Sequence, residues 1–180
     1  MTKGVTMQLN TLSDALFNEL ADLYDAEQQL LEKLPRIARA ISTSSLRVAV
    51  ENHADETRDQ VSRLENAFGA LGKPPTRDIC ESMLGLLEEI DEILAAAGEP
   101  HVKDAVLIGA LQRIEHYEIA AYGTARAFAE QLDLDDVADL LQESLDEEAF
   151  TDRKLTQLAE GSLFSGGINT EASQAGQPRV

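Results

Sequence analysis

Two glutamates three residues apart, Glu115 and Glu118, lie within the segment LQRIEHYEIAAYGT at residues 111–124. Apolar residues recur there every three or four positions, which predicts a helix with one face toward a core. Both carboxylates fall on that face, because residues three apart are neighbours on a helix surface. Burying a carboxylate is costly unless it protonates or a cation offsets its charge. The spacing therefore indicates either raised pKa values or a metal site.

Three other predicted helices also carry polar residues in the middle of their apolar stripes. The spacing matches between the two helical pairs, since Glu27 and Glu56 are 29 residues apart and Glu118 and Glu148 are 30 residues apart. Two helical hairpins with this spacing would bring their acids into one layer. The candidate metal ligands are Glu27, His53, Glu56, Glu115, Glu118, Glu148 and Asp152.

A set of carboxylates with one histidine suits iron and manganese, which accept oxygen and imidazole ligands. Two divalent ions would offset four negative charges, so we expect two iron or manganese ions per chain, with iron favoured. Di-metal carboxylate bundles use a Glu from each of two helices and Glu-x-x-His from each of the other two. Here His53 precedes Glu56, which reverses that order, and the last helix has no histidine. The predicted site is therefore rich in carboxylates.

Each of these residues also has an ordinary structural interpretation. A single acid in an apolar stripe is more often a solvated residue at the edge of the core, and His53 alone would be interpreted in the same way. Two tyrosines, Tyr24 and Tyr122, fall on the same faces as Glu27 and Glu118. We interpret them first as packing residues and second as donors of a hydrogen bond or an electron beside the metals.

The apolar periodicity predicts four long helices and one short helix, with almost no strand. Pro35 is expected to bend the first helix, because proline removes an internal hydrogen bond. Short links join the first two long helices and the last two, so each pair is expected to be antiparallel. The long middle connection is a crossover. The predicted helices cover residues 11–41, 46–71, 78–97, 102–131 and 136–159.

This order of helices is the layout of ferritin-like bundles. The predicted fold class is therefore all-α, an antiparallel four-helix bundle with a short extra helix in the crossover between the second and third long helices. The predicted domain covers residues 11–160. Residues 1–10 are expected to form a flexible N-terminus. Residues 161–180 are rich in Gly and Ser and are expected to form a disordered tail.

The composition limits the classes of partner. The 180 residues include 15 Lys and Arg and 33 Asp and Glu, which gives a formal net charge of −18. Such an acidic surface repels phosphate groups, so we expect no binding to nucleic acid or to anionic membranes. The chain has one cysteine, Cys80, and no apolar run of signal-peptide or membrane-spanning length. We therefore expect a cytoplasmic protein.

Four segments of the chain carry a family resemblance: LYDAEQQLLEKLPRIARA, HADETRDQVSRLE, RIEHYEIAAYGT and LDEEAFTDRKLTQLA. They resemble the YciE/YciF family, also called domain of unknown function 892, over about residues 10–160. The resemblance implies a ferritin-like fold, a homodimer and a link to bacterial stress responses. Matching the family's motifs onto this chain nominates the same seven ligands.

Two functions of different kinds fit this pattern. In the first, a di-iron or di-manganese carboxylate protein of the bacterial stress response reacts with a small oxidant, peroxide or O₂, by peroxide disproportionation, peroxide reduction or iron oxidation. In the second, the chain is a non-catalytic structural or interaction protein whose metal site is structural or absent. Iron storage would require a large cage, whereas the resemblance indicates a dimer.

Overall fold

The structure is a computed structural model that describes residues 9–162 and 165–175. The expected flexible N-terminus, residues 1–10, lies almost entirely outside these ranges. Within them the fold is all-α, apart from one hairpin of two very short strands. The elements are α1 (Leu12–Ala40), α2 (Ser44–Ala70), α3 (Glu81–Ala95), α4 (Pro100–Gln131), α5 (Asp135–Glu160), β1 (Gly161–Ser162), β2 (Ser165–Gly166) and α6 (Ile168–Gln174).

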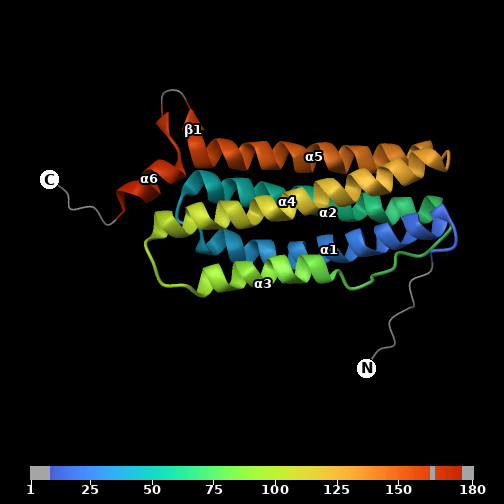
Figure 1. Cartoon of the computed structure of the whole chain (residues 1–180), viewed down its shortest axis with the longest axis horizontal. Helices are drawn as coiled ribbons and strands as arrows, with labels where there is room; N and C mark the ends of the chain where they lie inside the picture. The colour runs from blue at the N-terminus through green and yellow to red at the C-terminus, as the bar shows by residue number, and fades with distance from the viewer. Residues whose placement is uncertain (1–8, 163–164, 176–180) are drawn as a thin grey trace.

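Four long helices, α1, α2, α4 and α5, lie side by side along one axis (Figure 1). α1 packs against α2 and α4, and α5 packs against the same two helices, so the four form a closed ring, here called the bundle. Neighbours in the ring run antiparallel (Figure 1). The short helix α3 packs on the outside against α1 and α4. The all-α fold predicted from the sequence is confirmed.

The ends of the helices follow from the local sequence. Thr11 and Asp14 form a capping box at the start of α1, with each backbone N–H donating to the other residue's side chain at 3.0 and 3.1 Å. Gly72 follows α2 with a φ of 63°, which glycine adopts without strain. α1 is one continuous helix through Pro35. These boundaries lie within a few residues of the predicted ones.

A layer of polar residues divides the buried core into two apolar clusters. One cluster includes Leu34 and Leu107 and lies toward the end of the bundle that carries α6. The other includes Leu20 and Phe68 and lies toward the opposite end. The buried polar residues between the two clusters are Glu27, His53, Thr57, Gln60, Glu115, Glu118, Ser144, Glu148 and Thr151. The apolar packing on both sides fixes the depth of this polar layer.

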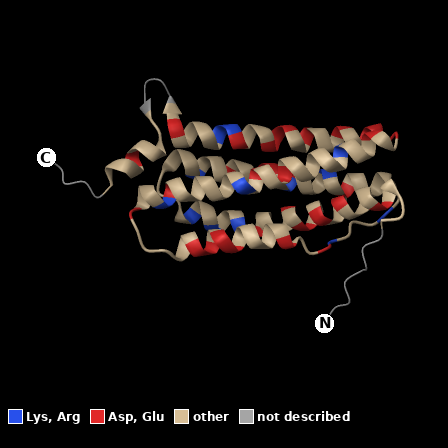
Figure 2. Ribbon diagram, in the orientation of Figure 1, with Lys and Arg blue, Asp and Glu red and all other residues tan. Residues whose placement is uncertain are grey.

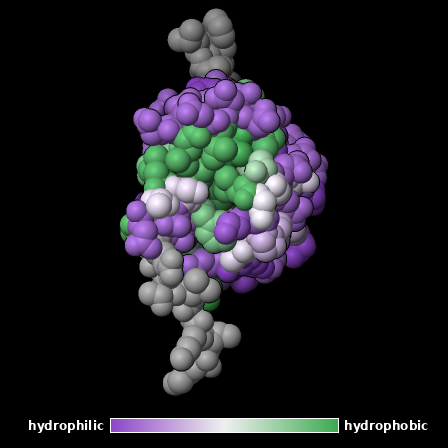
Figure 3. All heavy atoms as spheres, turned by 90° about the vertical axis from the view of Figure 1, so that its right-hand side faces the viewer, coloured by the Kyte–Doolittle hydropathy of each residue, from purple (hydrophilic) through white to green (hydrophobic). Residues whose placement is uncertain are grey.

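Charged residues occur along all the long helices, and acidic residues are more numerous than basic ones (Figure 2). Among the described residues, no helix is long and apolar enough to cross a membrane. The end of the bundle opposite α6 presents apolar surface bordered by hydrophilic residues (Figure 3). Leu71, Leu132 and Leu134 lie in the turns at this end and are only partly buried.

The described part of the C-terminal region, residues 161–162 and 165–175, is folded, in contrast to the disordered tail expected over residues 161–180; residues 163–164 and 176–180 lie outside the described residues. β1 pairs with β2, and α6 packs against α4 and α5. Ile168 is 3% exposed and belongs to the apolar cluster that contains Leu34. Gly167 approaches the end of α5 so closely that an added Cβ would lie 2.3 Å from the Ala159 carbonyl oxygen. One apolar anchor in a segment rich in Gly and Ser gives little periodic signal, so the sequence did not reveal it.

Replacing Ile168 by alanine should lower the free energy of unfolding by about 2–4 kcal/mol, because the substitution leaves a cavity in a packed core. Chemical denaturation of the full-length chain measures this change. The control is Ile79→Ala, since Ile79 is 66% exposed and its truncation should cost less than about 0.5 kcal/mol. Small and equal effects of the two substitutions would show that α6 does not stabilise the bundle.

Candidate metal centre

Four buried side chains from three helices converge in the polar layer, and we call them the tetrad. His53 comes from α2, Glu115 and Glu118 from α4, and Glu148 from α5. One ligand atom of each lies within 4.8 Å of those of the other three. Glu115 Oε1 approaches the His53 imidazole most closely, at 3.5 Å from its Nε2 atom. Atoms that share one ion at 2.0–2.6 Å are up to roughly 5 Å apart, so the tetrad has the dimensions of a metal site.

Apolar neighbours on the same helix face turn the two α4 glutamates inward. Leu111 and Ile114 precede them and Tyr122 follows, and all three are buried. Their burial fixes the rotation of α4 about its axis. Because residues three apart share a face, Glu115 and Glu118 must then point into the layer together.

The tetrad contains many polar atoms without hydrogen-bond partners. Both ring nitrogens of His53, both carboxylate oxygens of Glu115 and of Glu118, and one oxygen of Glu148 are buried and make no hydrogen bond in the described part of the chain. Buried polar groups in native proteins are nearly always satisfied. Carboxylate oxygen and imidazole nitrogen atoms are ligands that iron and manganese accept. The residues present therefore fit a bound metal ion.

Burial raises the pKa of each of the four buried carboxyl groups in the layer, Glu27, Glu115, Glu118 and Glu148. For Glu118, the charges of Glu27, Glu148 and Glu115 raise the pKa further. His53 acts in the opposite direction and lowers the pKa of Glu148, because a positive charge on the ring would favour the carboxylate. Without a cation these carboxyl groups therefore hold protons to higher pH than ordinary glutamates do.

Glu27 lies beside the tetrad and shares its environment. Its Oε1 atom accepts a hydrogen bond of 2.5 Å from Tyr122, while its Oε2 atom is buried without a partner. Besides burial, the charge of Glu148 raises the pKa of Glu27. Of the two predicted tyrosines, Tyr122 thus contacts the layer, whereas Tyr24 donates to Glu65 at 2.9 Å.

The structure places Glu56 and Asp152 outside the tetrad. Glu56 has a side chain that is 35% exposed, and its Oε2 atom lies 3.6 Å from His53 Nδ1. The contact with His53 holds the pKa of Glu56 below its ordinary value. Asp152 accepts a hydrogen bond of 3.1 Å from Gln112 and lies 3.2 Å from Nε2 of His116, which is 69% exposed. Asp152 therefore contacts residues near the protein surface and does not belong to the tetrad.

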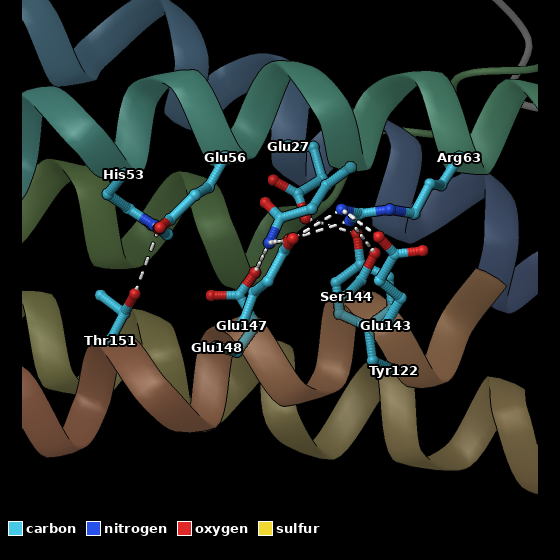
Figure 4. Close-up of polar contacts among 11 residues, drawn as sticks. Glu27, His53, Glu56, Arg63, Tyr122, Glu143, Ser144, Glu147, Glu148 and Thr151 are labelled. Carbon is cyan, nitrogen blue, oxygen red and sulfur yellow. Dashed lines mark hydrogen bonds and ion pairs between the residues drawn. The ribbon is translucent and has the colours of Figure 1, made fainter. Parts of the chain in front are cut away.

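A hydrogen-bond network that the sequence did not reveal supports Glu148 (Figure 4). The Gln60 amide donates to Glu148 and, at 3.1 Å, to Glu147. Arg63 binds both oxygens of Glu147, at 2.6 and 2.8 Å, and also Ser144 at 3.0 Å. Gln60 lies on the apolar stripe of α2. Because its side chain is neutral, the sequence alone did not identify it as part of a charged site. The network holds one oxygen of Glu148 and leaves the other free.

A small cavity reaches the tetrad between α2 and α5. Its volume is about 10 Å³, and its lining includes His53, Glu115, Thr151 and Lys154. This volume is roughly that needed for one water molecule. Among the described residues, this cavity is too small for an organic substrate beside the tetrad.

The fold and the site together define an all-α protein with a buried carboxylate–histidine cluster that can hold a metal ion. Residues 11–172 match the family model described as domain of unknown function, DUF892, and the chain belongs to this family. It is 41% identical over 154 residues to Protein YciF of Escherichia coli strain K12, a match that covers 85% of this chain and 93% of that protein. The family resemblance found in the sequence is confirmed.

Solved structures of relatives share the fold. The crystal structure of the E. coli stress protein YciF matches with a TM-score of 0.81 at 41% identity, over 84% of this chain and 96% of that one. YcfI of Rhodopseudomonas palustris, provisionally described as a structural protein, matches with a TM-score of 0.82 at 35% identity, over 88% and 99%. A Xanthomonas campestris protein at 19% identity and a TM-score of 0.71 shows the fold alone, over 91% and 97%.

Without metal, the protein should be more stable at about pH 5.5 than at about pH 8. The raised pKa values mean that, above the ordinary value of 4.5, the native state binds more protons than the unfolded chain. The free energy of unfolding therefore falls as pH rises through this window. Thermal melts in the presence of a chelator measure the difference.

Glu118→Gln should reduce this pH dependence, because the amide stays neutral in both states. The matched control is Glu88→Gln, which removes an exposed carboxylate from α3 and should keep the wild-type dependence. The same pH dependence in all three proteins would contradict the assignment of raised pKa values to the buried layer.

Proposed function

We propose that this chain is a ferritin-like di-metal protein that binds iron or manganese in its polar layer and reacts with peroxide or O₂. The observation that carries the proposal is the tetrad, whose ligand atoms are buried, lie within 4.8 Å of one another and mostly lack hydrogen-bond partners. The closed ring of four antiparallel helices supports it, because ferritin-like bundles build metal sites from inward-facing side chains of such helices.

The proposed ligands are His53, Glu27, Glu115, Glu118 and Glu148. Their four carboxylates would carry four negative charges when ionised, and two divalent ions offset that charge. Unpartnered oxygens on both Glu27 and Glu148 support a second metal position beside the tetrad. Iron is favoured over manganese, because oxygen and nitrogen sites generally bind Fe²⁺ more tightly than Mn²⁺.

When bound, iron or manganese would supply the redox chemistry with peroxide or O₂ and an open coordination position. The chain's own residues prepare the site. Tyr122 fixes one oxygen of Glu27, and Gln60 fixes one oxygen of Glu148. The cavity of about 10 Å³ beside His53 supports a reactant of very small size and disfavours an organic one.

A second candidate function is a non-catalytic structural protein in which the metal only stabilises the bundle. The description of the relative YcfI favours this alternative.

We further propose a role in the bacterial stress response, which the name of the E. coli relative supports. We also propose a homodimer that covers the apolar end in Figure 3, because apolar patches bordered by polar residues often mark protein contacts.

Mn²⁺ should raise the melting temperature of the metal-free protein. At about one hundred times the dissociation constant, binding adds about 2.7 kcal/mol, which corresponds to roughly 5–10 °C for a chain of this size. Glu118→Gln should lose most of this increase, because it removes a charged ligand. Thermal melts with and without Mn²⁺ measure both effects.

The same substitution should leave the metal-free melting temperature unchanged or higher at about pH 8, since it relieves repulsion among buried carboxylates. Glu88→Gln is again the control and should keep the full response to Mn²⁺. If Glu118→Gln and Glu88→Gln respond to Mn²⁺ alike, the tetrad is not the metal site.

The protein loaded with iron or manganese should consume peroxide faster than the same concentration of free metal ion. Oxygen evolution and peroxide absorbance measure the rate, with Glu118→Gln as the inactive variant. Full metal binding with no turnover above the free ion would favour the structural alternative.

A further inference from the structure

A small cavity borders the tetrad between α2 and α5. Along the bundle axis, the two apolar clusters close the polar layer at both ends. Between α2 and α5, in contrast, the cavity beside His53 and Glu115 is bordered by Thr151 and Lys154, and Lys154 is only partly buried. This side therefore offers a route from solvent to the tetrad.

Glu56 lies next to this cavity, and its partly exposed carboxylate contacts His53 of the tetrad. Its side chain is 35% exposed, and its Oε2 atom lies 3.6 Å from His53 Nδ1 and accepts a long hydrogen bond of 3.4 Å from Thr151 (Figure 4). The other ring nitrogen of His53 faces Glu115 at 3.5 Å. His53 thus connects a half-exposed carboxylate with a fully buried one.

The size of the cavity makes a carboxylate useful at this position. A hydrated divalent cation is larger than one water molecule, so it must lose water before it passes a space of about 10 Å³. Glu56 does not line the cavity, but it contacts His53 and Thr151, which do, so its carboxylate oxygen can replace that lost water beside the cavity. Lys154 has the opposite effect, because its positive charge is close enough to act on Glu56 and repels an arriving cation.

We propose that Glu56 is the uptake residue of this site: it captures a divalent cation from solvent and passes it to His53 and the buried carboxylates, while Lys154 slows the transfer. The inference rests on the proposed function and adds the route by which the site is loaded. It assigns Glu56 a role in the rate of loading, in place of the permanent ligand role predicted from the sequence.

Rapid mixing of the metal-free, full-length protein with Mn²⁺ tests the route, with a metal-indicator dye reporting the free ion. Glu56→Gln should slow uptake by about tenfold or more, because a charged capture group is lost. Lys154→Gln should speed uptake severalfold. Glu51→Gln removes an exposed carboxylate from the same helix and should take up Mn²⁺ at the wild-type rate. The amount of Mn²⁺ bound at saturation should be the same in all four proteins.

Two outcomes overturn the uptake role alone. The first is an Mn²⁺ uptake rate in Glu56→Gln that equals the rate of the wild-type protein. The second is a loss of Mn²⁺ bound at saturation in Glu56→Gln, which would make Glu56 a permanent ligand. Failure of the wild-type protein itself to bind Mn²⁺ would instead overturn the proposed function, and the uptake role with it.

Discussion

The repulsion among four carboxyl groups in one buried layer is the constraint on which the rest of this structure depends. Each group is fully buried, and burial together with the neighbouring charges raises its pKa. Such a layer persists only if protons or cations offset the charge. Apolar packing on both sides shields the layer from bulk solvent, so the same packing that stabilises the bundle makes an ionised carboxylate there more costly unless a cation is bound.

The surrounding polar contacts orient the layer without neutralising it. Arg63 lies close by, but it pairs with Glu147 and not with the tetrad. Gln60 and Tyr122 each hold one carboxylate oxygen and leave the second oxygen of Glu148 and Glu27 unpartnered. Neutral donors that fix a carboxylate while leaving a lone pair free are typical of groups that support metal ligands. The layer can thus hold a metal ion as well as protons.

Much of the fold and of the candidate site could be predicted from the sequence, because apolar periodicity fixes which side of each helix is buried. That reasoning brought Glu115, Glu118 and Glu148 to one depth from two different helices. It could not separate them from Glu56 and Asp152, since a residue three or four positions from a buried ligand lies only about 40–60° away around the helix.

Features that depend on partners from other helices were not predictable in this way. The hydrogen bonds of Gln60 depend on the position of α5 relative to α2, which no local pattern encodes. Ile168 is buried because α6 returns to the bundle, although its neighbours in the sequence are mostly small or polar. In both cases the tertiary contact, and not the local sequence, decides the structure.

Anomalous X-ray diffraction from crystals of the full-length protein grown with Mn²⁺ tests the central claim most directly. The account predicts two anomalous peaks in the polar layer, one within roughly 2.0–2.6 Å of tetrad atoms and a second beside Glu27 and Glu148. A polar layer without an anomalous peak, with its carboxyl groups joined by hydrogen bonds or water, would contradict it.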